Sequence, residues 1–450
     1  MNVLEAIEWA GIVGCGGAGF PTHAKLKGDI QHLILNGAEC EPLLRTDRYV
    51  MKHHADAIVK AVIAVKSALS IPQCTIALKE AYREEGAALE RAIAARKAPI
   101  SLHRMRSFYP AGDEQTLVAE VTGRVVPPAG IPLDVGCVVS NVTTFYMAAQ
   151  AMEGKPFTQK YLTVTGLVKR PVVVKVPLGT PFSFCLELAG GTTVSAWTAI
   201  SGGPMMGKRL TQEEALQSFV TKTTSGIIVL PADSELVGRE KIPLSHMIQR
   251  AKSACIQCRS CTDLCPRYLL GHPIEPHRIM RQIARLGMEG AAADQGALAH
   301  ASLCCECGIC ELYACPMGLQ PRKVNHMLKE ELGKIRYRWP KGEGQEACSS
   351  LREERKVPTR RAAARAGVLE FYDRCGTDDL SQGIPPQVTI SLQQHIGAPA
   401  VPTVKVGDWV ETGALIAKIP EGKLSANLHA SITGRVTAVD SAIVITREVG

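Results

Sequence analysis

A chain of 450 residues is too long for one ordinary hydrophobic core and predicts two to four domains. Its 46% hydrophobic and 21% charged residues exclude an intrinsically disordered protein. A net charge of +8 is small for this length and argues against a nucleic-acid partner. No basic leader precedes an apolar run at the N-terminus, and no span is apolar enough for a membrane helix. We therefore expect a cytoplasmic protein without membrane insertion.

Residues 1–155 alternate between strand-like and helical patterns. The strand-like runs are 32–36, 74–80, 100–105 and 137–141, and the helical patterns that follow them are 49–69, 84–96, 112–121 and 143–152. This alternation predicts an α/β layer around a largely parallel sheet.

The rest of the chain divides by composition. Residues 156–240 are rich in β-branched residues, proline and glycine, which predicts a small β-rich domain. Residues 241–335 place helical patterns around most of the cysteines. A basic segment, 336–385, reads as a linker, and 386–450 returns to short alternating strands that predict a separate β-module. The fold class is thus a multidomain α/β protein.

Nine of the 16 cysteines lie between Cys255 and Cys315. Clustered cysteines in a chain without an export signal indicate metal ligands rather than disulfides. The two arrays are Cys255-x2-Cys258-x2-Cys261-x3-Cys265-Pro266 and Cys304-x2-Cys307-x2-Cys310-x4-Cys315-Pro316.

Such paired arrays are typical of two-cluster bacterial ferredoxins, in which the fourth cysteine binds the other cluster. We assign one [4Fe-4S] cluster to Cys255, Cys258, Cys261 and Cys315, and the other to Cys304, Cys307, Cys310 and Cys265. Zinc is the alternative, but zinc sites seldom need triple x2 spacing twice. The choice between Cys304 and Cys305 stays open, although the x2 spacing favours Cys304.

A glycine-rich segment, GCGGAGFPTHAKL, starts at Gly14. Gly14, Gly16 and Gly19 satisfy the G-x-G-x-x-G pattern of dinucleotide-binding folds, and Glu39 follows at the expected distance. The preceding residues, however, predict a helix rather than the buried strand that this fold requires. By itself the pattern leaves an ordinary glycine turn open.

Several motifs in a fixed order resemble the flavin-binding chain of respiratory complex I and the C subunit of Rnf complexes. They are GCGGAGFPTHAKL, LILNGAECEPLLRTDRYVM, YPAGDEQTL, VSNVTT, PLGTPF and SGGPMMG, and with the cysteine arrays they cover about residues 1–330. The resemblance implies an α/β domain that binds FMN and NADH, a β-grasp domain, and a helical, ferredoxin-like domain with two clusters.

The resemblance also implies roles for individual residues. The backbone amides of Gly16, Gly17 and Gly19 would hold the FMN phosphate, and Phe20 and Glu41 would receive NADH. Lys25 and Asn36 would contact the flavin, while Asn141 and Thr144 would close the pocket. The full candidate set is Gly14, Gly16, Gly17, Gly19, Phe20, Lys25, Asn36, Glu39, Glu41, Asn141 and Thr144.

The final segment is similar to a barrel-sandwich module, which in the Rnf protein precedes the flavin domain. Lys423 within it lacks a clear carrier hairpin, so we expect a docking role rather than covalent modification. This module order resembles the cobalamin reductases of propanediol-utilisation bacterial microcompartments. That family implies electron flow from NADH through FMN and two clusters to cobalamin, reducing Co(III) and Co(II) to Co(I). It implies a corrinoid adenosyltransferase and shell proteins as partners, and a location inside the microcompartment.

Two other functions remain as alternatives. One is an electron-relay component of a membrane ion-translocating complex, similar to the C subunit of Rnf complexes. The other is a scaffold that binds partners through its basic linker and C-terminal module. The sequence has no D-x-H-x-x-G motif for base-off cobalamin, so the residues that contact the corrinoid stay open.

Overall fold

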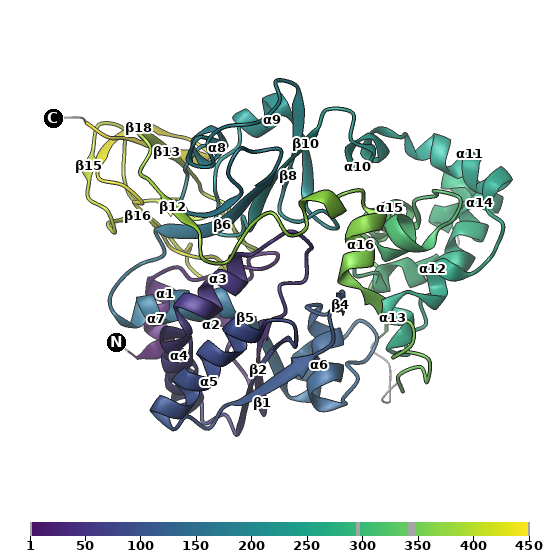
Figure 1. The fold of residues 1–450 in the computed structure, drawn as a ribbon, viewed down its shortest axis with the longest axis horizontal. Coiled ribbons are helices and arrows are strands. Elements are labelled where there is room, and N and C mark those ends of the chain that lie inside the picture. The colour runs from purple at the N-terminus through teal and green to yellow at the C-terminus, as the bar shows by residue number, and fades with distance from the viewer. Residues whose placement is uncertain (1, 294–297, 341–346, 449–450) are drawn as a thin grey trace.

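The computed structural model describes residues 2–293, 298–340 and 347–448, so residues 341–346 of the expected linker lie outside it. Figure 1 shows four parts: the α/β domain below, the β-rich domain above it, the helical cysteine domain at the right, and the C-terminal module at the upper left. The multidomain α/β organisation that the sequence predicted is confirmed.

The α/β domain is built on four parallel strands in the order β3-β2-β1-β5. The strands are β1 (His32–Gly37), β2 (Gln73–Lys79), β3 (Ser101–Met105) and β5 (Cys137–Asn141). The helices are α1 (Val3–Trp9), α2 (Thr22–Lys25), α3 (Thr46–His53), α4 (Ala55–Ala68), α5 (Arg83–Arg96), α6 (Glu114–Thr122) and α7 (Val142–Met152), with a 3-10 turn η1 (Pro132–Val135).

Strand β1 is buried on both faces, and its successive residues point to opposite sides of the sheet. Leu33 and Leu35 pack in the core with α4 and α7, whereas Ile34 packs in a second core with α6. The strand order reverses at β1, since β2 and β3 lie on one side of it and β5 on the other. The carboxyl ends of two such strands form a crevice in which α/β proteins bind ligands.

The second domain surrounds a mixed sheet in the order β12-β7-β6-β10-β8-β9. Its elements are β6 (Gln159–Gly166), β7 (Val172–Pro177), α8 (Phe182–Leu188), β8 (Trp197–Ser201), β9 (Lys208–Thr211), α9 (Gln212–Leu216) and β10 (Gly226–Pro231). Val172, Val174 and Phe182 fill its core. The edge strand β12 (Leu380–Gln382) comes from much later in the chain and pairs in parallel with β7.

The cysteine region is helical, with its cysteines in the connections. Its elements are α10 (Glu235–Gly238), η2 (Arg239–Lys241), α11 (Leu244–Ala254), α12 (Ser260–Asp263), α13 (Pro266–Leu269), α14 (Pro276–Ala293), η3 (Ala299–Leu303), a π-helical turn η4 (Ile309–Ala314) and α15 (Pro321–Lys334). Met247, Ile279 and Val324 form the centre of its core. The domain therefore has a hydrophobic core apart from its cysteines.

The described part of the segment expected as a linker packs against earlier domains. Strand β11 (Val357–Pro358) pairs with β4 (Phe108–Tyr109) of the α/β domain. Helix α16 (Thr359–Arg365) and the turn η5 (Leu369–Phe371) follow before β12. In Figure 1 this light green segment runs from the cysteine domain back to the β-rich domain. It therefore connects three domains by direct contact.

The C-terminal module consists of two small sheets, in the orders β13-β19-β18-β15 and β14-β16-β17. Its strands are β13 (Gln387–Ser391), β14 (Val401–Pro402), β15 (Trp409–Val410), β16 (Leu415–Lys418), β17 (Leu428–His429), β18 (Gly434–Val439) and β19 (Ala442–Thr446). Ile390, Val436 and Ile445 are buried between the sheets. The module contacts the glycine loop, because the Ile396 N–H donates to the Gly19 carbonyl at 3.2 Å.

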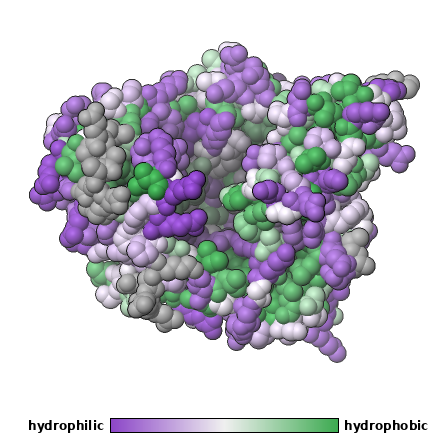
Figure 2. Space-filling model, turned by 180° about the vertical axis from the view of Figure 1, so that it is seen from behind, coloured by the Kyte–Doolittle hydropathy of each residue, from purple (hydrophilic) through white to green (hydrophobic). Residues whose placement is uncertain are grey.

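Hydrophilic side chains are spread over the face that Figure 2 shows, which is hollowed near its middle. Within residues 2–293, 298–340 and 347–448, none of the helices combines the length and apolar character needed to span a lipid bilayer.

Candidate active site

A cavity of about 570 Å³ lies at the carboxyl ends of β1 and β5, where the strand order reverses. Asn36 of β1 and Asn141 of β5 are register partners, and both line this flavin cavity, as we call it below. The candidate residues in its wall are Gly14, Gly16, Gly17, Gly19, Phe20, Lys25, Asn36, Glu41 and Asn141. Nine candidates, distant in sequence, thus meet at one cavity.

The glycine loop, residues 14–19, presents unpaired backbone donors to the cavity. Among the described residues, no hydrogen bond uses the N–H groups of Gly16, Gly17 or Gly19. A Cβ on Gly16 would lie 2.8 Å from the Asn141 side chain, whereas a Cβ on Gly17 would meet nothing within 4 Å. Free amides beside open space fit the phosphate of FMN, because successive backbone N–H groups form anion-binding concavities.

Buried groups hold the glycine loop from behind. The Gly14 N–H donates to the Phe20 carbonyl at 3.0 Å and closes the loop. The Cys15 N–H donates to Thr144 Oγ1 at 3.0 Å, and Lys160 Nζ donates to the Cys15 carbonyl at 3.3 Å. Lys160 is only 1% exposed, so water screens its charge little, and that charge favours an anion in front of the loop.

Lys222 joins three domains behind the same loop. Its ammonium group donates to the carbonyls of Gly11 and Asn427, each at 2.7 Å. Burial lowers the pKa of Lys222 to about 7. Gly19 has a φ of +74°, and a Cβ there would approach the Gln394 carbonyl oxygen to 3.0 Å, so glycine is required at this contact.

The two asparagine side chains are fixed by hydrogen bonds. Asn36 Nδ2 donates to the Gly112 carbonyl at 2.9 Å, and Asn141 Nδ2 donates to Asp47 at 2.8 Å. Asn141 Oδ1 also accepts from the Thr143 N–H at 2.9 Å, at the start of α7. These bonds leave little rotational freedom at the cavity wall, which suits the binding of a planar ring.

Lys25 and Phe20 lie on the opposite wall from β5, on the loop and on α2. Lys25 forms an ion pair with Glu114, the first residue of α6, and both line the cavity. Phe20 is half-buried, which leaves part of its ring free for stacking.

Glu41 is buried and binds the β-rich domain. Its carboxylate accepts the N–H groups of Met205 and Met206 at 2.8 and 2.9 Å, in the SGGPMMG motif. Burial raises the pKa of Glu41 to about 7, against the opposing effect of these two hydrogen bonds. Glu41 thus fixes the β-rich domain at the cavity edge, and its contact with NADH stays a prediction.

Two candidates do not line the cavity. The Glu39 carboxylate accepts the N–H groups of Asp47 and Arg48, both at 3.0 Å, and so caps the start of α3. Burial, followed by the charge of Asp47, raises the pKa of Glu39 to about 7. Thr144 is buried and supports the loop through Cys15. Both residues position the site from outside it.

Sequence reasoning missed a set of wall residues that connect the cavity to the cysteine domain. The Tyr109 hydroxyl donates to the Cys307 carbonyl at 2.8 Å. Asp113 accepts two hydrogen bonds from Arg267, each 2.8 Å, and Arg267 lies two residues after Cys265. Tyr109 and Asp113 belong to the YPAGDEQTL motif, and that motif was the signal that could have identified them.

The two cysteine arrays have the same local backbone conformation. Gln257 and Arg259 of the first array have φ values of 54° and 68°, and Glu306 and Gly308 of the second have 57° and 79°. These residues occupy the second and fourth positions after the first cysteine of each array. The repeated left-handed turns wind both loops in the same way, as equivalent cluster-binding loops require.

The first predicted set of cluster ligands is brought together. Cys255, Cys258, Cys261 and Cys315 line one small cavity of about 30 Å³. Burial raises the pKa of Cys261 to about 12, and the neighbouring thiols of Cys315, Cys258 and Cys255 add to the rise.

The second set is deeper in the protein. Burial raises the pKa of Cys265, and the thiols of Cys305 and Cys304 raise it further. Burial likewise raises the pKa of Cys310, to which Cys304 and Cys265 contribute. Cys304 Sγ accepts the Glu306 N–H at 3.3 Å, whereas Cys305 lines the flavin cavity. Hydrogen bonds to sulfur tune iron–sulfur clusters, so this contact favours Cys304 as the ligand.

Neither set of thiols is drawn in to a single point. In the part of the chain that the structure describes, no three cysteine, histidine or acidic side chains are placed to hold one metal ion. The loop conformation and the crossed grouping of the thiols are what fit two clusters. The second set reaches the flavin cavity directly, because Cys307 forms part of its wall.

Family models match four parts of the chain. They are the Nuo51 FMN-binding domain at residues 7–150, the SLBB domain at 161–209, the 4Fe-4S dicluster domain at 254–320, and the RnfC barrel sandwich hybrid domain at 379–448. These matches confirm FMN and two [4Fe-4S] clusters as the cofactors, and they confirm the four-part architecture.

Known proteins match the chain over different lengths. The cobalamin reductase PduS of Salmonella typhimurium is 40% identical over 450 residues, which are 99% of this chain and 96% of that protein. PduS of Citrobacter freundii is 39% identical, over 97% of this chain and 94% of that protein. The RnfC-type component of the Na(+)-translocating ferredoxin:NAD(+) oxidoreductase complex of Acetobacterium woodii is 34% identical, over 58% of this chain and 56% of that protein. Similarity across the whole length, including the C-terminal module, places the chain in the family of PduS cobalamin reductases.

Proposed function

We propose that this protein is an NADH-dependent oxidoreductase that reduces cobalamin from Co(III) and Co(II) to Co(I). The observation that carries the proposal is the wall of the flavin cavity, in which the glycine loop and Cys307 line the same space. FMN supplies the conversion between two-electron hydride transfer and single-electron transfer, which nicotinamide cannot perform with iron–sulfur clusters. The chain thus places a flavin site and a cluster site in direct contact.

The residues of the chain divide the work of binding. The amides of Gly16, Gly17 and Gly19 hold the phosphate, and Asn36 and Asn141 orient the ring. The eight predicted cysteines bind the two clusters, in the sets Cys255, Cys258, Cys261, Cys315 and Cys304, Cys307, Cys310, Cys265. Tyr109 and the Asp113–Arg267 pair hold the cysteine domain against the flavin cavity.

NADH binds at the open side of the cavity, between Phe20 and Glu41. The Phe20 ring stacks with the nicotinamide or adenine base, since it lies half-exposed at the wall. A carboxylate has about four acceptor positions, so Glu41 can accept a ribose hydroxyl while it keeps both methionine N–H bonds.

Anaerobic reconstitution with iron, sulfide and FMN tests the function. The holoprotein should contain about eight iron atoms and reduce both ferricyanide and hydroxocob(III)alamin with NADH. A Gly16→Val variant should lose FMN, because the added side chain would collide with Asn141. Ferricyanide reduction without cobalamin reduction would leave a flavin dehydrogenase and discard the proposed substrate.

The proposal extends to partners and location. Co(I) is consumed by adenosylation, so we expect a corrinoid adenosyltransferase to act with this protein during propanediol degradation. We also expect contact with shell proteins inside a bacterial microcompartment. Supplying adenosyltransferase and ATP to the NADH-driven assay should yield adenosylcobalamin, and isolated microcompartments should contain this protein.

A further inference from the structure

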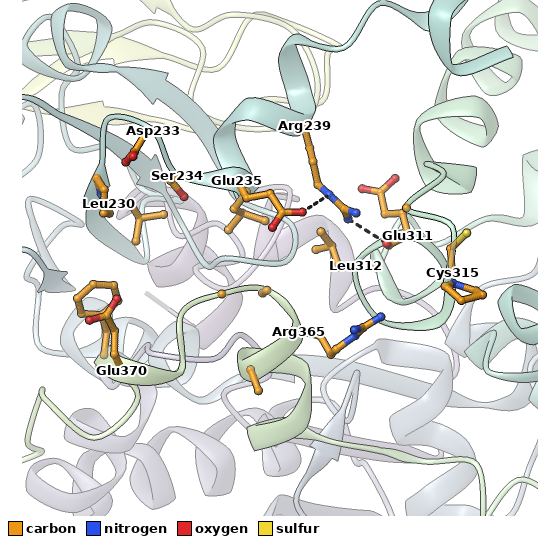
Figure 3. A pocket seen from close by; sticks show the side chains of 18 residues that line it. Leu230, Asp233, Ser234, Glu235, Arg239, Glu311, Leu312, Cys315, Arg365 and Glu370 are labelled. Atoms are coloured by element: carbon orange, nitrogen blue, oxygen red, sulfur yellow. Dashed lines mark hydrogen bonds and ion pairs between the residues drawn. The ribbon is translucent and has the colours of Figure 1, made fainter. Parts of the chain in front are cut away.

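A second cavity of about 460 Å³ lies where three segments of the chain converge. Its wall is formed by residues 230–239 after β10, residues 311–318 between the last two cysteine-domain helices, and residues 364–371 of α16 and η5. Figure 3 shows Arg365 extending toward Glu311 and Cys315, with Glu370 and Asp233 on the far side. We call it the distal cavity.

The two cavities contact different sets of cysteines. Cys307 of the second set lines the flavin cavity, and Cys315 of the first set lines the distal cavity. Cys315 is the thiol with the largest effect on Cys261, which places it with the first set. Among the described residues, none lines both cavities. A path that starts in the flavin cavity and ends in the distal cavity therefore crosses both cluster-binding sets.

The distal cavity carries charged side chains that are free to meet a ligand. Within the described residues, Arg365, Asp233 and Glu370 form no hydrogen bond or ion pair through their side chains, and all three are exposed. By contrast, Arg239 in the same wall donates to the Glu311 carbonyl at 3.1 Å and pairs with Glu235 at 3.5 Å. The rim thus offers charges of both signs.

The floor of the distal cavity is apolar. Leu230, Leu236 and Phe371 are at most 3% exposed, and Leu312 is 5% exposed. An apolar floor with a few polar groups at the rim is typical of small-molecule sites, and the volume lies within the range of roughly 300 to 1,000 Å³ for such sites. Docking of a protein would instead require a broad contact surface.

We propose that the distal cavity is the corrinoid site, at which electrons leave the protein. This inference rests on the proposed function. A corrin ring has apolar faces and an edge of amide groups, each of which donates and accepts hydrogen bonds. Arg365 donates to amide carbonyls, Asp233 and Glu370 accept amide N–H groups, and the apolar floor contacts one face of the ring. The cavity encloses part of the corrinoid and holds its cobalt near the Cys315 set.

The electron balance is simple at this site. Oxidation of one NADH to NAD⁺ releases two electrons and one proton. Two Co(III) corrinoids are therefore reduced to Co(II), or one corrinoid is carried from Co(III) to Co(I). No further reductant is required, and the corrinoid loses its axial ligand to solvent as cobalt is reduced.

The test compares two charge reversals on one helix. Arg365→Glu removes the donor in the cavity wall, and Arg361→Glu makes the same change one turn earlier on α16, outside the wall. Ala364→Trp is the second variant, because residue 364 lines the cavity from an exposed position, where a large side chain can fill the space. Each holoprotein is assayed anaerobically with NADH for hydroxocobalamin and ferricyanide reduction. Calorimetric titration with hydroxocobalamin measures binding separately.

Arg365→Glu and Ala364→Trp should each lower kcat/KM for hydroxocobalamin and weaken its binding by about tenfold or more, since a charged hydrogen bond or the cavity itself is lost. Ferricyanide reduction and the Arg361→Glu variant should match the unmodified protein. Unchanged cobalamin kinetics and binding would overturn the site. An equal loss of ferricyanide and cobalamin reduction would overturn it as well, because the residues would then act on the clusters. If the unmodified protein reduces ferricyanide alone, the proposed function itself fails.

Discussion

The two cysteine arrays share a backbone conformation but lie in different surroundings. Cys258 of the first array is exposed, whereas Cys307 and Cys310 of the second are 7% and 8% exposed. Tyr109 from the α/β domain contacts the second array at Cys307. The first array borders the distal cavity through its partner Cys315.

This difference separates arrays that spacing alone makes look alike. Cluster potentials depend on hydrogen bonds to sulfur and on solvent exposure, so equal ligands in unequal surroundings give unequal potentials. The buried array lies beside the flavin cavity and the exposed one lies away from it. The comparison assigns entry of electrons to the buried array and exit to the exposed one.

The largest expected effect comes from removing one ligand of each array. Cys258→Ser and Cys307→Ser should each lose about half of the iron and lower NADH-driven cobalamin reduction more than about 100-fold, because both clusters lie on one path. Iron analysis and anaerobic absorbance measure both quantities.

Ferricyanide reduction should persist in both variants, since it can draw electrons at the flavin cavity. Only Cys307→Ser should also lower Tm clearly, because its thiol is packed in a hydrophobic core and Cys258 is exposed. Full cobalamin reduction in either variant would show that the clusters do not form one path.

Glu41 sharpens the comparison through pH, since it lies on the buried side. Its folded-state pKa of about 7 lies above its ordinary value of 4.5, so its contribution to stability is complete below pH 4.5 and is lost as pH rises through 7. Glu41→Gln should therefore reduce the fall in unfolding free energy between pH 5 and pH 8 by about 2 to 3 kcal/mol. Anaerobic urea titrations at both pH values measure this fall, and an unchanged fall would show that Glu41 does not titrate there.

Tyr109→Phe tests the contact that only the buried array has. Loss of the hydroxyl leaves the Cys307 carbonyl without its donor and should lower the unfolding free energy by about 1 to 3 kcal/mol. Tyr313→Phe on η4 is the control, because no hydrogen bond of its hydroxyl is found among the described residues, and urea titration compares the two. Equal effects would contradict a specific role for Tyr109.

The smallest effects come from equivalent positions of the two loops. Gly308→Ala places a Cβ at a φ of +79° and should cost about 1 to 2 kcal/mol. Arg259→Gly should change the unfolding free energy by less than about 0.5 kcal/mol, because relief of the left-handed backbone offsets the loss of the exposed ion pair with Asp263. Urea titration of both holoproteins measures the pair. A larger cost for Arg259→Gly would show that the two loops are not equivalent.

Much of the α/β domain could be predicted from local pattern. The period of two in β1 and the apolar spacing of α4 identify their buried faces, because neighbouring residues carry that signal. The structure of residues 357–382 could not be predicted in this way. Their strands β11 and β12 pair with β4 and β7, which lie far earlier in the chain, and a basic, proline-containing composition does not record such partners.

The site shows the same division. The glycines and Asn141 were found because a motif places the required residue types at fixed spacing, whereas Glu39 satisfied a spacing rule and instead caps α3. Asp113 was missed because its partner, Arg267, is 154 positions away.

By itself the sequence determined that two loops of equal spacing could each bind a cluster and that a glycine loop could bind an anion, because those properties belong to short segments. Only the tertiary structure decided which array borders the flavin cavity, that Glu41 holds the β-rich domain, and that a second cavity opens beside Cys315. The physical reason is that burial and contact arise between segments distant in the chain, and these set the environment in which identical ligands act.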